Sequence, residues 1–65
     1  MIMMIQKQHK VADGGGEVVW SDEVRSYIVE FIREVLDDLR IHEPDKIFRV
    51  LELGETPGQD KVLDW

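Results

Sequence analysis

The sequence predicts a small α+β fold in a single domain of 65 residues. A β-hairpin is expected over about 2–11 and 17–20, followed by one amphipathic helix over about 21–40. A shorter helix is expected over about 44–53. Three observations indicate this order: a glycine-rich turn between two strand-like segments, a long stretch of helical periodicity, and a proline beyond it.

The predicted hairpin turns at Asp13–Gly16, where three consecutive glycines can take positive φ and weaken any regular element. The segment before the turn begins with apolar residues and then mixes apolar and polar ones. The segment Glu17–Trp20 is β-branched and aromatic, which is typical of a strand. These features together favour a hairpin.

The predicted central helix begins at Ser21, whose hydroxyl suits an N-cap. Asp22 and Glu23 then place negative charge at the positive end of the helix dipole. Apolar residues follow with the spacing i, i+3, i+4 and i+7. They are Val24, Tyr27, Ile28, Phe31, Ile32, Val35, Leu36 and Leu39.

This helix is expected to carry an unusually wide apolar surface. With Val29 included, the apolar residues cover an arc of about 200° when each residue is turned by about 100°. A helix that packs on one surface needs roughly half that arc. We therefore expect the helix to be covered on two sides, by the hairpin and by a second element, a second subunit or a target.

The segment after Pro44 allows two interpretations. Pro44 and Asp45 suit a first helical turn, and Gly54 suits a C-terminal cap. Polar residues also fall at every third position, which favours a helix over about 44–53. They are Lys46, Arg49, Glu52 and Glu55. In this interpretation residues 55–65 are a tail, in which Trp65 docks on the domain or on a partner.

The alternative is a strand, because Ile47–Leu53 is rich in β-branched and aromatic residues. Glu55–Gly58 would then be the turn of a second hairpin that returns through Lys61–Trp65. The sequence favours the helix by a narrow margin.

Composition predicts an association partner. A chain this short builds a marginal core, and the absence of cysteine excludes disulfides and thiolate metal sites. Self-association, most simply as a homodimer, is therefore expected. The net charge of −6 disfavours nucleic acid and anionic membranes and favours a protein with a basic surface. The apolar opening Met1–Ile5 is too short for a signal peptide or a membrane span, which predicts a cytoplasmic protein.

No motif predicts catalysis, a cofactor or a metal. His9 and His42 lack the spacing of a zinc site. A hydrolytic triad would need Ser21 or Ser26 beside a histidine and a carboxylate, but Ser21 is assigned to the cap and Ser26 to the polar side of the helix. Gly14–Gly16 lacks the lysine and hydroxyl residues of a phosphate-binding loop.

Two sets of residues are the candidate binding sites. The first is an acidic ridge on the predicted helix, expected to contact a basic protein surface. It consists of Glu30, Glu34, Asp37 and Asp38. The second is an apolar set that can meet a second subunit or a target. It consists of Tyr27, Val29, Leu36 and Trp65.

The leading hypothesis is a noncatalytic acidic interaction module that acts as a small inhibitor, adaptor or antitoxin-like regulator. The alternative is a dimeric nucleic-acid-binding regulator. A strand followed by Ser21–Val24 and two helices loosely resembles the ribbon-helix-helix repressors. Those proteins use a basic strand and no tight glycine hairpin, and this chain offers only Lys7, His9 and Lys10 for groove contacts.

Overall fold

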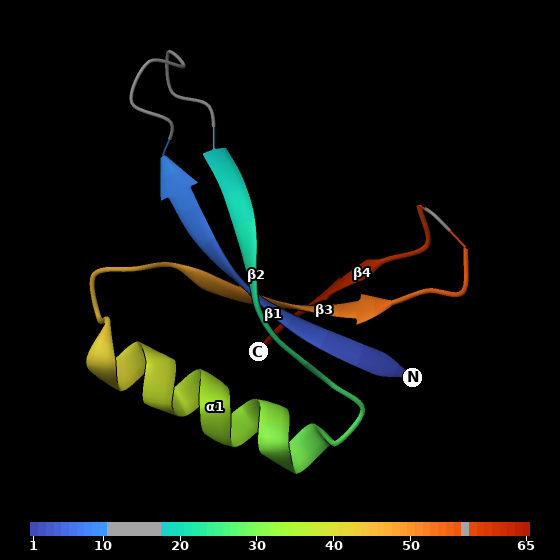
Figure 1. The fold of residues 1–65 in the computed structure, drawn as a ribbon, viewed down its shortest axis with the longest axis horizontal. Coiled ribbons are helices and arrows are strands. Elements are labelled where there is room, and N and C mark those ends of the chain that lie inside the picture. The colour runs from blue at the N-terminus through green and yellow to red at the C-terminus, as the bar shows by residue number, and fades with distance from the viewer. Residues whose placement is uncertain (11–17, 57) are drawn as a thin grey trace.

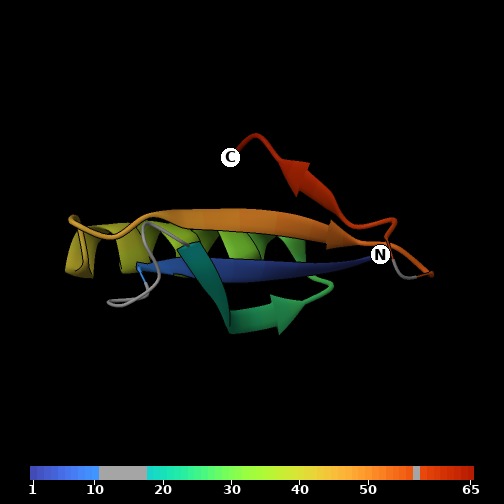
Figure 2. The ribbon, with the colours of Figure 1, turned by 90° about the horizontal axis from the view of Figure 1, so that it is seen from above.

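The computed structural model describes residues 1–10, 18–56 and 58–65 (Figure 1). Their elements are β1 (Ile2–Lys10), β2 (Val18–Ser26), α1 (Val29–His42), β3 (Phe48–Leu53) and β4 (Lys61–Leu63). The strands form one antiparallel sheet in the order β2-β1-β3-β4. Figure 2 shows α1 behind β1 and β3, so the fold has a helical layer on one face of the sheet.

The N-terminal hairpin is confirmed. β1 and β2 pair antiparallel, from Met3 opposite Ser26 to Lys10 opposite Val18. The second strand continues six residues beyond its predicted end at Trp20. The predicted turn at Asp13–Gly16 lies outside the described residues.

The prediction of one long helix over 21–40 is wrong at its N-terminal end. Residues 21–26 belong to β2, and α1 contains 14 residues from Val29. Ser21 is therefore not the N-cap. That position falls on Ile28, which makes no side-chain cap bond, and the Ile28 N–H donates to Ser26 Oγ at 3.1 Å. The helical spacing failed here because β1 offers cross-strand partners to the residues on both sides of Glu23, and tertiary pairing overrides a local pattern.

The prediction of a helix over 44–53 is also wrong, and the strand alternative is correct. β3 lies between β1 and β4, with Val50 opposite both Ile5 and Leu63. The residues 55–65 are not a tail, because they contain β4. Gly54 is not a helix cap. A Cβ there would collide with Gln59, so close approach within the β3–β4 connection requires glycine.

The core lies between α1 and the sheet. Its buried members are Met3, Ile5, Ile32, Leu36, Phe48 and Val50. Six partly buried apolar residues pack around them: Val24, Val29, Val35, Leu39, Leu63 and Trp65. This core fixes the orientation of α1, because Ile32 and Leu36 point inward and the opposite side of the helix faces solvent.

The opposite face of the sheet, here called the open face, also carries apolar residues. Directly paired residues share a face, and residues two apart on a strand share it too. Met4, Leu51 and Val62 are therefore neighbours on this face, flanked by the pair Ile2 and Leu53. In the described ranges, no helix or strand lies over it (Figure 2).

A register shift gives β2 its local shape. Val24 lies opposite Ile5 and Asp22 lies opposite Gln6, so Glu23 has no direct partner and forms a β-bulge. The bulge keeps Val24 against the core while it places both Asp22 and Arg25 on the open face. The bulge thus sets which charged side chains of β2 that face presents.

Candidate interaction surfaces

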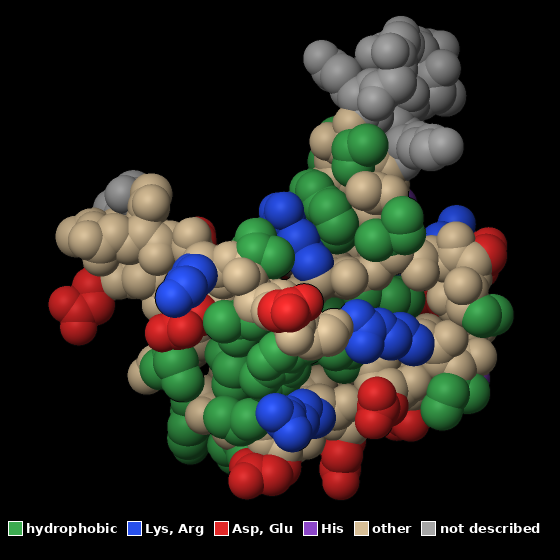
Figure 3. Space-filling view, turned by 180° about the vertical axis from the view of Figure 1, so that it is seen from behind, with side chains coloured by type: hydrophobic (Ala, Val, Ile, Leu, Met, Phe, Trp, Pro, Cys, Tyr) green, Lys and Arg blue, Asp and Glu red, His purple; other side chains and the backbone are tan. Residues whose placement is uncertain are grey.

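The acidic ridge runs along the outward side of α1. Glu30, Glu34, Asp37 and Asp38 are all exposed. At 3.6 residues per turn they fall within an arc of about 100°, centred away from Ile32 and Leu36. Figure 3 shows acidic side chains along the edge of the molecule that α1 forms. The structure therefore gathers all four predicted ridge residues on one accessible surface.

The ridge carboxylates have no partner among the described residues. The salt bridge found there joins Lys7 and Glu43, outside the ridge. Glu30 with Glu34, and Glu34 with Asp38, are like-charged pairs at i, i+4, each of which destabilises a helix by about 0.2–0.5 kcal/mol. Arg40 and His42 occupy the last turn of α1, so Asp37 and Asp38 lie before the turn in which the helix dipole acts most strongly. The ridge therefore weakens the helix that carries it.

The predicted apolar set divides into one exposed residue and three that contact the core. Tyr27 is 76% exposed. Val29 and Trp65 are partly buried and pack against the core. Leu36 is 3% exposed and belongs to the core itself, so its assignment to a partner surface was wrong. Packing within the chain therefore buries, wholly or partly, three of the four residues that were predicted to contact a partner.

The structure adds two exposed residues that the predicted sites omitted. Ile28 is 47% exposed and Phe31 is 46% exposed, and both are close to Tyr27 along the chain. We call these three residues the apolar patch. Phe31 precedes Glu34 by three positions on α1, so the patch adjoins the acidic ridge. The wide apolar arc of the predicted helix could have indicated these exposed residues, because a sheet on one side of a helix covers only part of such an arc.

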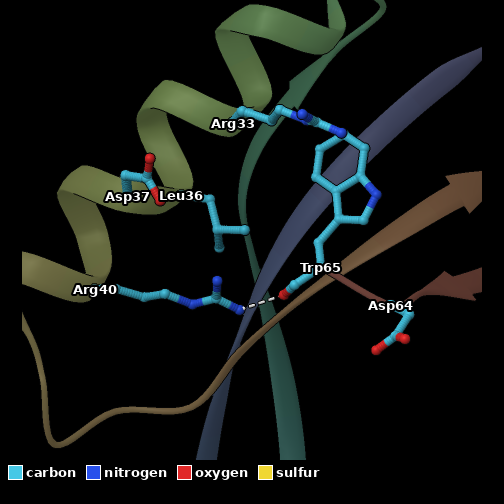
Figure 4. Close-up of a pocket in the computed structure, with 6 residues that line it drawn as sticks. All are labelled: Arg33, Leu36, Asp37, Arg40, Asp64 and Trp65. Carbon is cyan, nitrogen blue, oxygen red and sulfur yellow. Dashed lines mark hydrogen bonds between the residues drawn. The ribbon is translucent and has the colours of Figure 1, made fainter.

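A pocket of about 320 Å³ lies between α1 and the end of the chain (Figure 4). Arg40 donates from its guanidinium to the backbone oxygen of Trp65 at 2.6 Å, and the Arg33 guanidinium carbon lies 4.9 Å from the centroid of the Trp65 ring. Asp37 and Asp64 also line the pocket and balance the two arginine charges. Trp65 is therefore docked on its own chain, and the pocket has no excess positive charge for an anionic ligand.

A polar cluster lies beyond the C-terminal end of α1. Lys7 Nζ donates to Glu43 Oε1 at 2.8 Å, and this hydrogen bond is the main cause that raises the pKa of Lys7 above its usual value. His9 Nε2 lies 2.7 Å from Ser21 Oγ, which in turn donates to Glu23 at 3.4 Å. The sequence reasoning missed the contact between His9 and Ser21 because it assigned Ser21 to a helix cap.

The contact between His9 and Ser21 is within the reach of a nucleophile and its base, but among the described residues it lacks the third group of a catalytic triad. A catalytic histidine needs a group that orients its second ring nitrogen, whereas Glu23 bonds the serine. In the described part of the chain, no hydrogen bond to His9 other than that of Ser21 is present. The imidazole is also exposed, so water is not excluded from the pair.

Within the described ranges, the structure shows neither a cluster of metal ligands nor a membrane-spanning helix. No three histidine, aspartate or glutamate side chains of the described residues are placed to hold one metal ion. In the same residues, no helix combines the length and apolar composition needed to span a membrane. His42 is exposed in the last turn of α1.

No family model, curated protein or solved structure matches the chain. The assignment of a function therefore depends on the residues and their geometry.

Proposed function

We propose that this protein is a noncatalytic interaction module that binds a basic protein surface through the outer side of α1. The observation that carries the proposal is the apolar patch of Tyr27, Ile28 and Phe31, exposed beside the acidic ridge. The module would act as a small inhibitor, adaptor or antitoxin-like regulator by covering its partner's surface.

The apolar patch supplies the anchor for such a contact. Aromatic side chains dominate the energetics of many interfaces, because they bury a large area with few rotatable bonds. Tyr27 and Phe31 are large, exposed and close together on the chain. Core packing does not explain their exposure, since Ile32 and Leu36 fill the inward side of α1.

The acidic ridge supplies charge complementarity. Four carboxylates that have no partner among the described residues are available to lysine and arginine side chains of another protein. Such charges raise association rates and reject acidic partners more than they raise affinity. The destabilisation that they cause within α1 is offset when a basic surface neutralises them.

The chain departs from the ribbon-helix-helix alternative in its architecture. Those repressors need a strand and two helices in each chain, whereas the described residues form four strands and one helix. The acidic outer side of α1 would also repel the phosphate backbone. We therefore propose protein binding alone.

The test is affinity capture with matched charge variants, using lysate from cells that express the protein. The ridge variant is Glu34→Lys with Asp38→Lys. Its control is Asp45→Lys with Glu55→Lys, which alters the net charge equally at exposed positions outside α1. Phe31→Ala removes the anchor. Supporting results are a basic protein retained by the wild type and the control but lost by the ridge variant and by Phe31→Ala.

The same experiment can overturn the proposal. Equal retention by the ridge variant and its control would show that net charge alone attracts the captured protein. A captured protein whose retention is insensitive to Phe31→Ala would remove the apolar patch from the contact. Circular dichroism of each variant ensures that the comparison is made between folded proteins.

A further inference from the structure

We infer that the open face of the sheet binds a second copy of this chain, so that two sheets pack face to face and the two α1 helices lie outside. This surface is on the opposite side of the sheet from α1. The inference is therefore independent of the proposed partner of the acidic ridge.

The open face has the apolar content of a buried surface. Met4 and Leu51 lie on this face but are already only 6% exposed within one chain, where an Arg25 guanidinium nitrogen lies 3.6 Å from Met4 Sδ, so the area free for a partner belongs to the residues around them. Around them, Ile2 is 45% exposed and Val62 is 57% exposed. A solvated sheet face normally alternates polar residues against the apolar side, so an apolar cluster here is typical of a face that packs on another layer.

The distribution of charge leaves the open face as the surface on which a second copy meets the least repulsion. Two molecules that each carry a net charge of −6 repel one another, so they must meet where acidic residues are fewest. Among the described strand residues, Asp22 is the acidic residue that the register places on the open face, and Arg25 and Arg49 accompany it. The ridge carboxylates lie on the far side of the molecule.

The charges of this face are also self-complementary. An isologous interface brings residue i of one copy to residue j of the other, and j to i. Asp22 and Arg25 share the open face because of the β2 bulge. A two-fold contact can therefore pair Asp22 of each copy with Arg25 of the other. Arg49 is held within its own chain, 4.0 Å from the Trp20 ring centroid and bonded to Gln6. Asp22 also accepts from Gln6 and Arg25 donates to Met4 Sδ, but both of these charged side chains stay exposed.

The first test measures mass by sedimentation equilibrium of the full chain from about 10 μM to about 1 mM. The expected result is a reversible species of twice the chain mass of 7.6 kDa. Val62→Asp, on the open face, should raise the dissociation constant at least about tenfold, because it buries an unpaired carboxylate. The matched control Ile41→Asp, exposed on α1, should leave it unchanged.

The second test uses charge exchange. Asp22→Arg and Arg25→Asp each create two like-charged contacts in a two-fold dimer, so each alone should dissociate. An equimolar mixture of the two variants restores both opposite-charge pairs and should form a heterodimer. A monomer at all concentrations, a dimer insensitive to Val62→Asp, or a mixture that stays monomeric would each overturn the inference. Circular dichroism shows whether each variant keeps the fold.

Discussion

The guanidinium carbon of Arg49 lies 4.0 Å from the centroid of the Trp20 ring. This contact joins β3 to β2, which are separated in the sheet by β1. Gln6 of β1 completes the connection, because its oxygen accepts from Arg49 Nε at 2.8 Å and its amide donates to Asp22 at 2.9 Å. A hydrogen-bonded row of side chains therefore crosses three strands on the open face.

We expect Arg49→Met to lower the free energy of unfolding by about 1–2 kcal/mol, because it removes both a cation–π contact and a charge-assisted hydrogen bond. Urea unfolding followed by tryptophan fluorescence measures the change. Arg33→Met is the matched control, since it removes only the longer contact to Trp65. Equal losses in the two variants would contradict the role assigned to the row.

The two serines near the start of α1 should differ in their effect on stability. Ser26→Ala is expected to cost about 0.5–1 kcal/mol, because its oxygen accepts the Ile28 N–H ahead of the helix. Ser21→Ala should cost less than about 0.5 kcal/mol, because Ser21 lies within β2 and makes only exposed side-chain contacts. Chemical denaturation of the two variants measures both values, and the reverse order would restore Ser21 as a cap.

Two apolar residues of α1 provide a test of its orientation. Leu36→Ala should cost about 2–5 kcal/mol, because it opens a cavity beneath the helix. Ile41→Ala, at a side chain that is 72% exposed, should change stability by less than about 0.5 kcal/mol. Thermal melting compares them directly. A large loss at Ile41 would mean that this side of α1 is covered.

The ion pair of Lys7 with Glu43 predicts an alkaline dependence of stability. A lysine whose pKa is raised by folding stabilises the folded state while it is protonated. This stabilisation of the folded state is fully present below the unfolded-state pKa of about 10.4. It is lost as the pH rises through the higher folded-state pKa. The stability difference between the wild type and Lys7→Gln should therefore stay constant near neutral pH and shrink above about pH 10.

Urea titrations across that pH range measure the difference at each pH. Lys46→Gln is a useful control, because Lys46 is exposed and forms no salt bridge among the described residues. A difference for Lys7→Gln that persists undiminished above about pH 11 would contradict the ion pair.

The sequence predicted the hairpin and the exposure of the ridge, because both depend on local signals. In the sequence three glycines separate the two strand-like segments, and four acidic residues at helical spacing favour a solvated side. The start of α1 was mispredicted because Val24 satisfies a helical period and also pairs with Ile5 across the sheet. Local spacing cannot decide between a helix and a strand when the nine-residue strand β1 is available to pair with the segment.

The apolar site was mispredicted for a related reason. From the sequence alone, Leu36 and Phe31 are equally good candidates for an interface, since both lie in the predicted apolar arc. Only the placement of β1 and β3 beneath α1 buries Leu36 and leaves Phe31 half exposed. The choice between core and surface along one helix therefore depends on long-range pairing. The segment of β3 was mispredicted as a helix for the same reason. It forms a strand because it pairs with β1 and β4, and local spacing does not reveal those partners.

The irregularity at Glu23 has a consequence for solubility. β2 is an outer strand nine residues long, and a flat strand of that length could recruit further chains into a growing fibril. The unpaired residue interrupts the row of amide groups that another strand would need, and it places a carboxylate at the interruption. The bulge therefore works against edge-to-edge growth at β2, one of the two edge strands of the sheet.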